Sequence, residues 1–115
     1  MLELAMREIN LAELTGHGAV RNLSGHIRGQ EARRFFGLDD ADRGDEEVVI
    51  CVPEEVYMVT PSFFQGMFAS SVHARGNDRE AFFRKFKFQA DSVVLKQIDR
   101  GIAAVLTRRD SSLFS

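Results

Sequence analysis

The chain has 115 residues and a formal net charge of −2 at pH 7, from 15 Lys and Arg against 17 Asp and Glu. This length fits one domain of the commonest size, with enough residues to build a core. The balance of charge gives no electrostatic reason to expect a nucleic-acid partner. No apolar run approaches the ~18–20 residues that span a bilayer, so we expect no membrane partner either.

The amino terminus and the cysteine content favour the cytoplasm. Residues 1–14 lack the basic segment followed by an apolar segment that marks a secretory signal. Cys51, the single cysteine, lies within an apolar run and has no partner for an internal disulfide. We expect it to be a buried small hydrophobic residue rather than a reactive thiol.

The first elements carry mixed signals. The composition of residues 1–14 favours a helix, but Ile9 and Leu11 alternate with polar neighbours. We expect a strand over Arg7–Leu11, because the later elements need an opening strand with which to pair. Residues 15–18 form a loop by their glycines, and residues 19–23 form a short extended piece.

A first helix follows, with Ser24 or Asn22 as its cap and Gly37 as its end. Gly25 and Gly29 weaken its first turns, which leaves its start open. Its apolar residues are Ile27, Ala32, Phe35 and Phe36.

Residues 39–47 hold six acidic side chains against Arg43 alone. The run lacks the alternating ligand positions, the glycine and the final glutamate of a calcium loop. We therefore expect a solvated acidic connection.

The stretch from Val48 to Gly76 organises the chain. The run Val48–Val52 is short and β-branched, which is typical of a strand covered on both faces, and it ends at Pro53. Residues 56–59 resume extended structure. Thr60 then caps a helix with Pro61 at its first position, and Gly76 closes that helix. The residues expected to face the core are Phe64, Met67, Phe68, Ser71 and Val72.

The last third predicts a turn, a strand and a helix. Residues 77–83 form a short turn, and residues 85–88 alternate as a strand whose Lys85 and Lys87 point to solvent. Asp91 or Ser92 caps a final helix. This helix has an apolar stripe of Val94, Leu95, Ile98, Ile102, Val105 and Leu106, basic Arg108 and Arg109 at its end, and a tail over 110–115.

This order of elements predicts a single α/β domain over residues 1–115. Strands that alternate with helices imply a mixed or parallel sheet, and we expect a mixed sheet of about four strands with helices packed against it.

The candidate chemistry is sparse. His17, His26 and His73 have no ligand spacing, and no second cysteine assists them, so we expect no metal site. No nucleophile with a base partner is apparent, and we expect no catalytic residue.

The segment from Gly16 to Arg34 is rich in glycine and arginine and precedes a helix. It is a candidate anion or ligand site, although it lacks the Walker and dinucleotide patterns. The candidate residues are Gly16, Gly18, Arg21, Ser24 and Arg28.

Ser62 is the other candidate, because it lies at the start of the helix that follows an extended segment. A phosphate on its side chain would meet the positive end of the helix and change a docking surface. The alternative is that Thr60, Pro61 and Ser62 serve only as a helix start.

With these elements in place, the chain resembles the STAS-like family of unknown function, which is related to the STAS domains of anti-sigma-factor antagonists. The resemblance rests on the strand Val48–Val52, on residues 56–64 with their Thr-Pro-Ser-Phe helix start, and on the closing strand and helix over 86–106.

The resemblance implies a cytoplasmic bacterial regulatory module that is not an enzyme and needs no cofactor. Its partner would be a protein, namely a serine kinase of the histidine-kinase-like ATPase fold. That kinase would phosphorylate Ser62, with Thr60 as the poorer candidate. Here Pro61 stands where antagonists carry an acidic residue, and Phe63 stands where they carry a small one.

Overall fold

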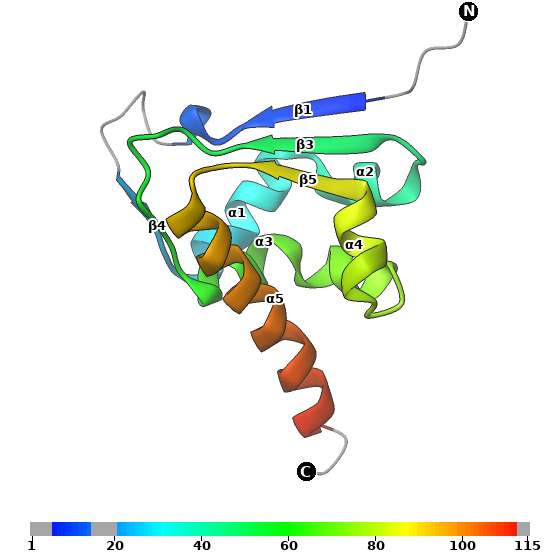
Figure 1. Ribbon diagram of the computed structural model, residues 1–115. Coiled ribbons are helices and arrows are strands. Elements are labelled where there is room, and N and C mark those ends of the chain that lie inside the picture. The colour runs from blue at the N-terminus through cyan, green and yellow to red at the C-terminus, as the bar shows by residue number, and fades with distance from the viewer. Residues whose placement is uncertain (1–5, 15–20, 113–115) are drawn as a thin grey trace, which may run out of the picture.

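The computed structural model describes residues 6–14 and 21–112, and the side chains among them up to residue 107 (Figure 1). It shows one α/β domain with a short 3-10 turn, η1, after its first strand. The elements are β1 (Met6–Asn10), η1 (Leu11–Glu13), β2 (Asn22–Leu23), α1 (His26–Phe36), α2 (Leu38–Arg43), β3 (Glu47–Cys51), β4 (Met58–Val59), α3 (Pro61–Ala74), α4 (Arg79–Lys85), β5 (Phe86–Gln89) and α5 (Ser92–Ser112).

The strands form two small sheets rather than one sheet of about four strands, and the pairing is parallel, the second of the two arrangements implied by the sequence, and not mixed. One sheet has the order β1-β3-β5, and the other pairs β2 with β4. In the first sheet Ile9 pairs with Ile50, which pairs with Phe88. Helices lie between β1 and β3 and between β3 and β5, so each strand restarts at the same end of the sheet, and this makes the pairing parallel.

The helices cover only one face of the three-stranded sheet (Figure 1). Val48, Ile50 and Phe86 point toward them and are fully buried. On the other face Val49 pairs in register with Glu8 and Lys87, whose side chains are exposed. The expectation that β3 is covered on both faces is therefore wrong. Val49 is nevertheless only 9% exposed, as expected for the central strand, because side chains of both neighbouring strands flank it.

The core between sheet and helices contains a cluster of aromatic rings among its aliphatic side chains. Phe64 and Phe68 of α3 face Phe82, Phe86 and Phe88, with ring centroids 4.8–6.4 Å apart within the group. The tightest pair, Phe82 and Phe86, is stacked at 4.8 Å. Edge-to-face and offset contacts of this kind add stability beyond the area they bury. The predicted core face of α3 is confirmed in full: Phe64, Met67, Phe68, Ser71 and Val72 are all buried.

Helices α1 and α3 cross with their backbones in contact at two glycines. A Cβ on Gly29 would lie 2.2 Å from the carbonyl oxygen of Phe63, and one on Gly66 would lie 2.1 Å from that of His26. No side chain fits at either position. Gly29, which the sequence suggests only as a weak point of the helix, is instead required by the crossing.

The acidic run 39–47 is only partly the solvated connection expected from the sequence: Asp39, Asp40, Asp45 and Glu47 are exposed, whereas Asp42 and Glu46 are partly buried. Its first half is the helix α2, which packs against α1 and α3. Arg33 of α1, with 10% of its side chain exposed, is ion-paired to Asp39 and Asp42 of α2. The same guanidinium donates to the carbonyl of Met67 and to the hydroxyl of Ser71 of α3, both at 2.9 Å. Two of the acidic residues therefore hold three helices together.

The predicted helix ends are largely confirmed. Thr60 caps α3 by accepting from the N–H of Phe63, and Asp91 caps α5 by accepting from the N–H of Val94. Gly37 and Gly76 have the positive φ of helix ends, 67° and 74°. The prediction for α1 is wrong, because Gly25 with φ 95° occupies its cap position in place of Ser24 or Asn22, and no side chain caps the helix. Helix α5 runs to Ser112, into the expected tail.

Lys85 does not point to solvent as the strand pattern predicts. It is the last residue of α4, is 6% exposed, and donates to the carbonyls of Gly44 and Glu46 at 3.0 and 2.8 Å. Burial lowers the pKa of the Lys85 ammonium, and the nearby charge of Arg75 lowers it further. Lys87 is exposed, as predicted.

Lys85→Met is expected to lower the free energy of unfolding by about 1–3 kcal/mol, because it leaves two partly buried carbonyls without this donor. Urea unfolding followed by circular dichroism measures the loss. The matched control is Lys87→Met, which we expect to stay within about 0.5 kcal/mol of the original chain. Equal losses in the two variants would place Lys85 at the surface.

The same pair tests the direction of the pKa shift. Above the lowered pKa of folded Lys85 and below the ordinary lysine pKa, the unfolded chain binds more protons than the folded chain. The contribution of Lys85 to stability therefore rises with pH in this window. Lys85→Met should remove that rise, and Lys87→Met should retain it.

Candidate functional site

The candidate regulatory serine lies at the junction of β4 and α3. Ser62 is exposed in the first turn of the helix, and its hydroxyl is 3.1 Å from that of Thr60. Thr60 Oγ1 also accepts from the N–H of Phe63 at 3.2 Å. The side chain of Phe63 is 2% exposed, so it holds the first turn of the helix against the core. Ser62 is thus presented to solvent on a fixed backbone, whereas the Thr60 hydroxyl is engaged as the cap.

The junction is held from both sides. The N–H of Thr60 donates to the carbonyl of Leu23 in β2 at 2.9 Å. On the opposite edge of β4, the side-chain amide of Gln97 accepts from the N–H of Val59 at 2.6 Å and donates to the carbonyl of Tyr57 at 3.2 Å. Gln97 therefore takes the place of a neighbouring strand and satisfies the free edge of β4.

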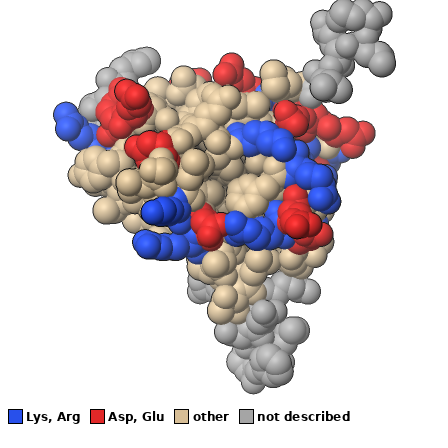
Figure 2. Space-filling view, in the orientation of Figure 1, with Lys and Arg blue, Asp and Glu red and all other residues tan. Residues whose placement is uncertain are grey.

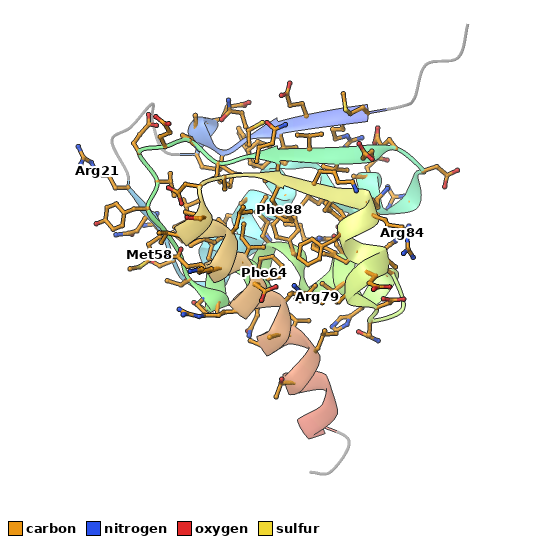
Figure 3. All side chains as sticks on the ribbon, in the orientation of Figure 1. Arg21, Met58, Phe64, Arg79, Arg84 and Phe88 are labelled. Carbon is orange, nitrogen blue, oxygen red and sulfur yellow. The ribbon has the colours of Figure 1, made fainter. Side chains whose placement is uncertain are left out.

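Two exposed apolar side chains precede the serine by four and five residues. Tyr57 and Met58 are 53% and 40% exposed, and the N–H of Tyr57 donates to the carbonyl of Arg21 at 2.9 Å. Figure 3 shows Arg21 and Met58 at the end of the molecule where β4 lies. The β4–α3 junction therefore combines an aromatic, a thioether and a cationic side chain near an exposed hydroxyl, a composition common in protein interfaces.

The glycine- and arginine-rich candidate site is only partly assembled. Ser24 and Arg28 line a cavity of about 530 Å³, whose walls include Phe35 and Phe63. Arg21 does not line it, and Gly16 and Gly18 lie outside the described residues. Because Phe63 follows Ser62, this cavity adjoins the start of α3.

Other reactive groups among the described residues form no site. No group of three or more His, Cys, Asp or Glu side chains within residues 6–14 and 21–107 is placed to hold a metal ion. His26 and His73 are exposed, and His73 hydrogen-bonds Asn77, while His17 lies outside the described residues. Burial raises the pKa of the Cys51 thiol, and the hydrogen bond and charge of Glu8 raise it further. This makes the thiolate scarce at neutral pH.

No sequence pattern points to Gln97, because a polar residue on the exposed side of a helix normally serves only as solvated surface. Its role depends on the position of β4, which the helix pattern does not indicate.

Within the described part of the chain, no helix combines the length and apolar character that a membrane span requires. Comparison of the chain with protein-family models, with curated proteins and with solved structures gave no match.

Proposed function

We propose that this chain is a STAS-like regulatory module that binds a protein partner through the β4–α3 junction and is controlled by phosphorylation of Ser62. The observation that carries the proposal is the exposed Ser62 hydroxyl on the first turn of a 14-residue helix, four and five residues after exposed Met58 and Tyr57. The proposed partner is a serine kinase of the histidine-kinase-like ATPase fold, as in anti-sigma-factor antagonist systems.

The positive end of the α3 dipole explains how phosphorylation at this position could act as a switch. A phosphate on Ser62 would place close to two negative charges by the positive end of α3, where the fold tolerates them. The same charges would enter an interface built on Tyr57 and Met58. An unpaired charge that loses its water there is costly, so modification would weaken the complex without unfolding the domain.

The binding of Ser62→Asp tests the proposal. We expect this variant to fold with an unchanged or slightly higher free energy of unfolding, by about 0.3–1 kcal/mol, because the carboxylate meets the helix dipole. It should bind a histidine-kinase-like ATPase at least tenfold more weakly than the original chain. Ser62→Ala should fold and keep its affinity. Isothermal titration calorimetry measures binding, and circular dichroism checks folding.

Ser70→Asp is the matched control, because Ser70 is an exposed serine on the same helix, far from its first turn. It should bind like the original chain. Equal binding of Ser62→Asp, Ser62→Ala and the original chain would remove the regulatory role. Unfolding of Ser62→Asp alone would show that the serine is part of the helix start and not a switch.

The alternative function is a small-ligand or nucleotide sensor that uses the Gly16–Arg34 region. It is favoured by the cavity that Ser24 and Arg28 share. A ligand that binds only the folded chain raises its melting temperature. A concentration-dependent rise with a nucleotide or phosphate, abolished by Arg28→Ala and retained by Arg34→Ala, would support this alternative.

A further inference from the structure

One of the two edges of the three-stranded sheet, that of β5, carries an inference that is independent of Ser62. The sheet ends at β5, and no strand of the described residues pairs with its outer side. The carbonyl of Gln89 accepts from the N–H of Val52 at 2.9 Å, so the backbone groups of Gln89 face β3. Because these groups alternate in direction along a strand, the N–H and C=O of Phe88 face the open edge. This edge can accept another strand.

A cavity of about 270 Å³ runs along the same edge. Phe86, Lys87 and Phe88 all line it, although the side chains of consecutive strand residues point to opposite faces. A space alongside the strand accounts for the contact with all three residues. The remaining walls are Phe83 of α4 and Leu95 and Ile98 of α5.

The aromatic wall of this cavity is held in place. The ring of Phe83 lies 6.0 Å from that of Phe88 in an edge-to-face arrangement. The guanidinium of Arg79 lies 5.1 Å from the centre of the Phe83 ring and is ion-paired to Asp99. Such a cation over an aromatic face restrains the ring. These contacts fix the position of the aromatic wall, and a preformed wall of this kind is typical of binding sites.

The charge beside the edge points to the chemistry of the occupant. Lys87 is exposed on the outer face of β5, and no acidic side chain of the described residues is ion-paired to it. Figure 2 shows an uncharged surface beneath β5 and between α4 and α5, bordered by basic and acidic side chains. A residue of an added strand opposite Lys87 would stand ~4.5–5.5 Å away, where an opposite charge is favourable.

We propose that the β5 edge binds an extended segment of a partner protein by strand addition, and that this segment has the pattern apolar–acidic–apolar. The acidic residue pairs with Lys87 on the outer face. The residues on either side point inward, because of the two-residue period, and fill the cavity between Phe83 and Leu95.

A second copy of this chain fits the edge less well. A symmetric antiparallel pairing of two β5 strands centred on Lys87 places the two ammonium groups opposite each other, which is unfavourable. Centred on Phe88, it places Lys87 opposite Gln89 and leaves both lysine charges without an acidic partner.

The test uses the full chain and a fluorescein-labelled peptide with a central Phe-Glu-Phe flanked by threonine and serine residues. Fluorescence anisotropy should show saturable binding, and a peptide with central Phe-Lys-Phe should bind more weakly. Leu95→Glu places a charge in the cavity and should weaken binding at least tenfold. Val93→Glu changes an exposed residue two positions away that does not line the cavity, and it should leave binding unchanged.

A charge exchange sharpens the test. Lys87→Glu should weaken binding of the Phe-Glu-Phe peptide up to about fivefold and strengthen binding of the Phe-Lys-Phe peptide by a similar factor, as expected for one cross-strand ion pair. Ser62→Asp should leave both affinities unchanged, which separates this surface from the proposed regulatory one. Circular dichroism confirms that each variant is folded.

Amide hydrogen exchange measured by NMR distinguishes strand addition from simple filling of the cavity. The N–H of Phe88 should exchange rapidly in the free chain and become protected when the peptide binds, whereas the N–H of Lys87, which faces β3, should be protected in both states. Three outcomes would overturn the proposal: no saturable binding up to about 1 mM peptide, binding that leaves Phe88 unprotected, or a dimer that protects Phe88 in the absence of peptide.

Discussion

Gly66→Ala should lower the free energy of unfolding by about 3 kcal/mol or more, and with it abolish the native packing of α1 on α3. The added Cβ would stand 2.1 Å from the carbonyl oxygen of His26 and 3.0 Å from the amide nitrogen of Gln30. Both atoms belong to the backbone of α1, so no side-chain rotation relieves the clash. Overpacking a core usually costs ~1–3 kcal/mol when side chains can shift, and here the helices must move apart. Urea unfolding followed by circular dichroism measures the loss.

Two other glycines separate this clash from the general effect of replacing a glycine. Gly44 has φ −98°, and its Cβ would have no neighbour nearer than 3.9 Å, so Gly44→Ala should change stability by at most about 0.5 kcal/mol. Gly76 has φ 74° and open space, so Gly76→Ala should cost only the backbone strain, about 1–2 kcal/mol. A loss for Gly66→Ala no greater than that for Gly76→Ala would contradict the backbone contact between α1 and α3.

Arg33→Met is expected to cost about 3–5 kcal/mol, the range for removing one partner of a buried ion pair. The variant keeps an unbranched side chain of similar reach but no charge. It leaves the carboxylate of Asp42, 11% exposed, without its cation, and it leaves the carbonyl of Met67 without this donor. One oxygen of Asp42 has no hydrogen-bond partner among the described residues, so little remains there to compensate. The measurement is again the free energy of unfolding in urea.

The matched control for this variant is Arg34→Met, because Arg34 is the next residue of α1 and is exposed. It should cost no more than about 0.5 kcal/mol. Adding Asp42→Asn to Arg33→Met removes the uncompensated charge and should recover part of the loss. If the double variant is as unstable as the sum of the two single variants, Arg33 and Asp42 do not act as a pair.

The parts of the fold that the sequence predicts are those set by near neighbours. Thr60 and Asp91 cap helices through hydrogen bonds to residues three positions away, and Gly37 ends its helix by its own φ. The core face of α3 follows from helical spacing. Each of these features needs only a few consecutive residues, so propensity and period are enough to find it.

The parts that it misses depend on residues far along the chain. The ammonium of Lys85 donates hydrogen bonds to carbonyls some forty positions earlier. The carboxylate of Asp42 is ion-paired to Arg33 and accepts a hydrogen bond from Ser71. Gly29 is required because Gly66 lies against it. In each case the local pattern predicts the commonest role for the residue type, a solvated charge or a weak helix position, and tertiary packing overrides it.

The candidate site shows the same division. The position of Ser62 at a helix start follows from Thr-Pro-Ser alone, and its exposure agrees with that pattern. The support that Gln97 gives to β4, and the shared cavity of Ser24 and Arg28, join segments that the sequence keeps apart. Neither the spacing of apolar residues nor a helix-cap motif indicates contacts between such distant segments.

The parallel order of the sheet also determines how the chain can reach its native state. Arg7 pairs with Val48, and Val48 pairs with Phe86, so each pairing closes a loop of about forty residues. Closing such a loop lowers the conformational entropy of the chain before the strand contacts form, and folding is slower in proteins whose contacts join residues far apart in sequence. The helices can form early, whereas the sheet cannot be complete until residues 86–89 are available. A nascent chain that ends before β5 would therefore expose the edge of β3, which only the last strand covers.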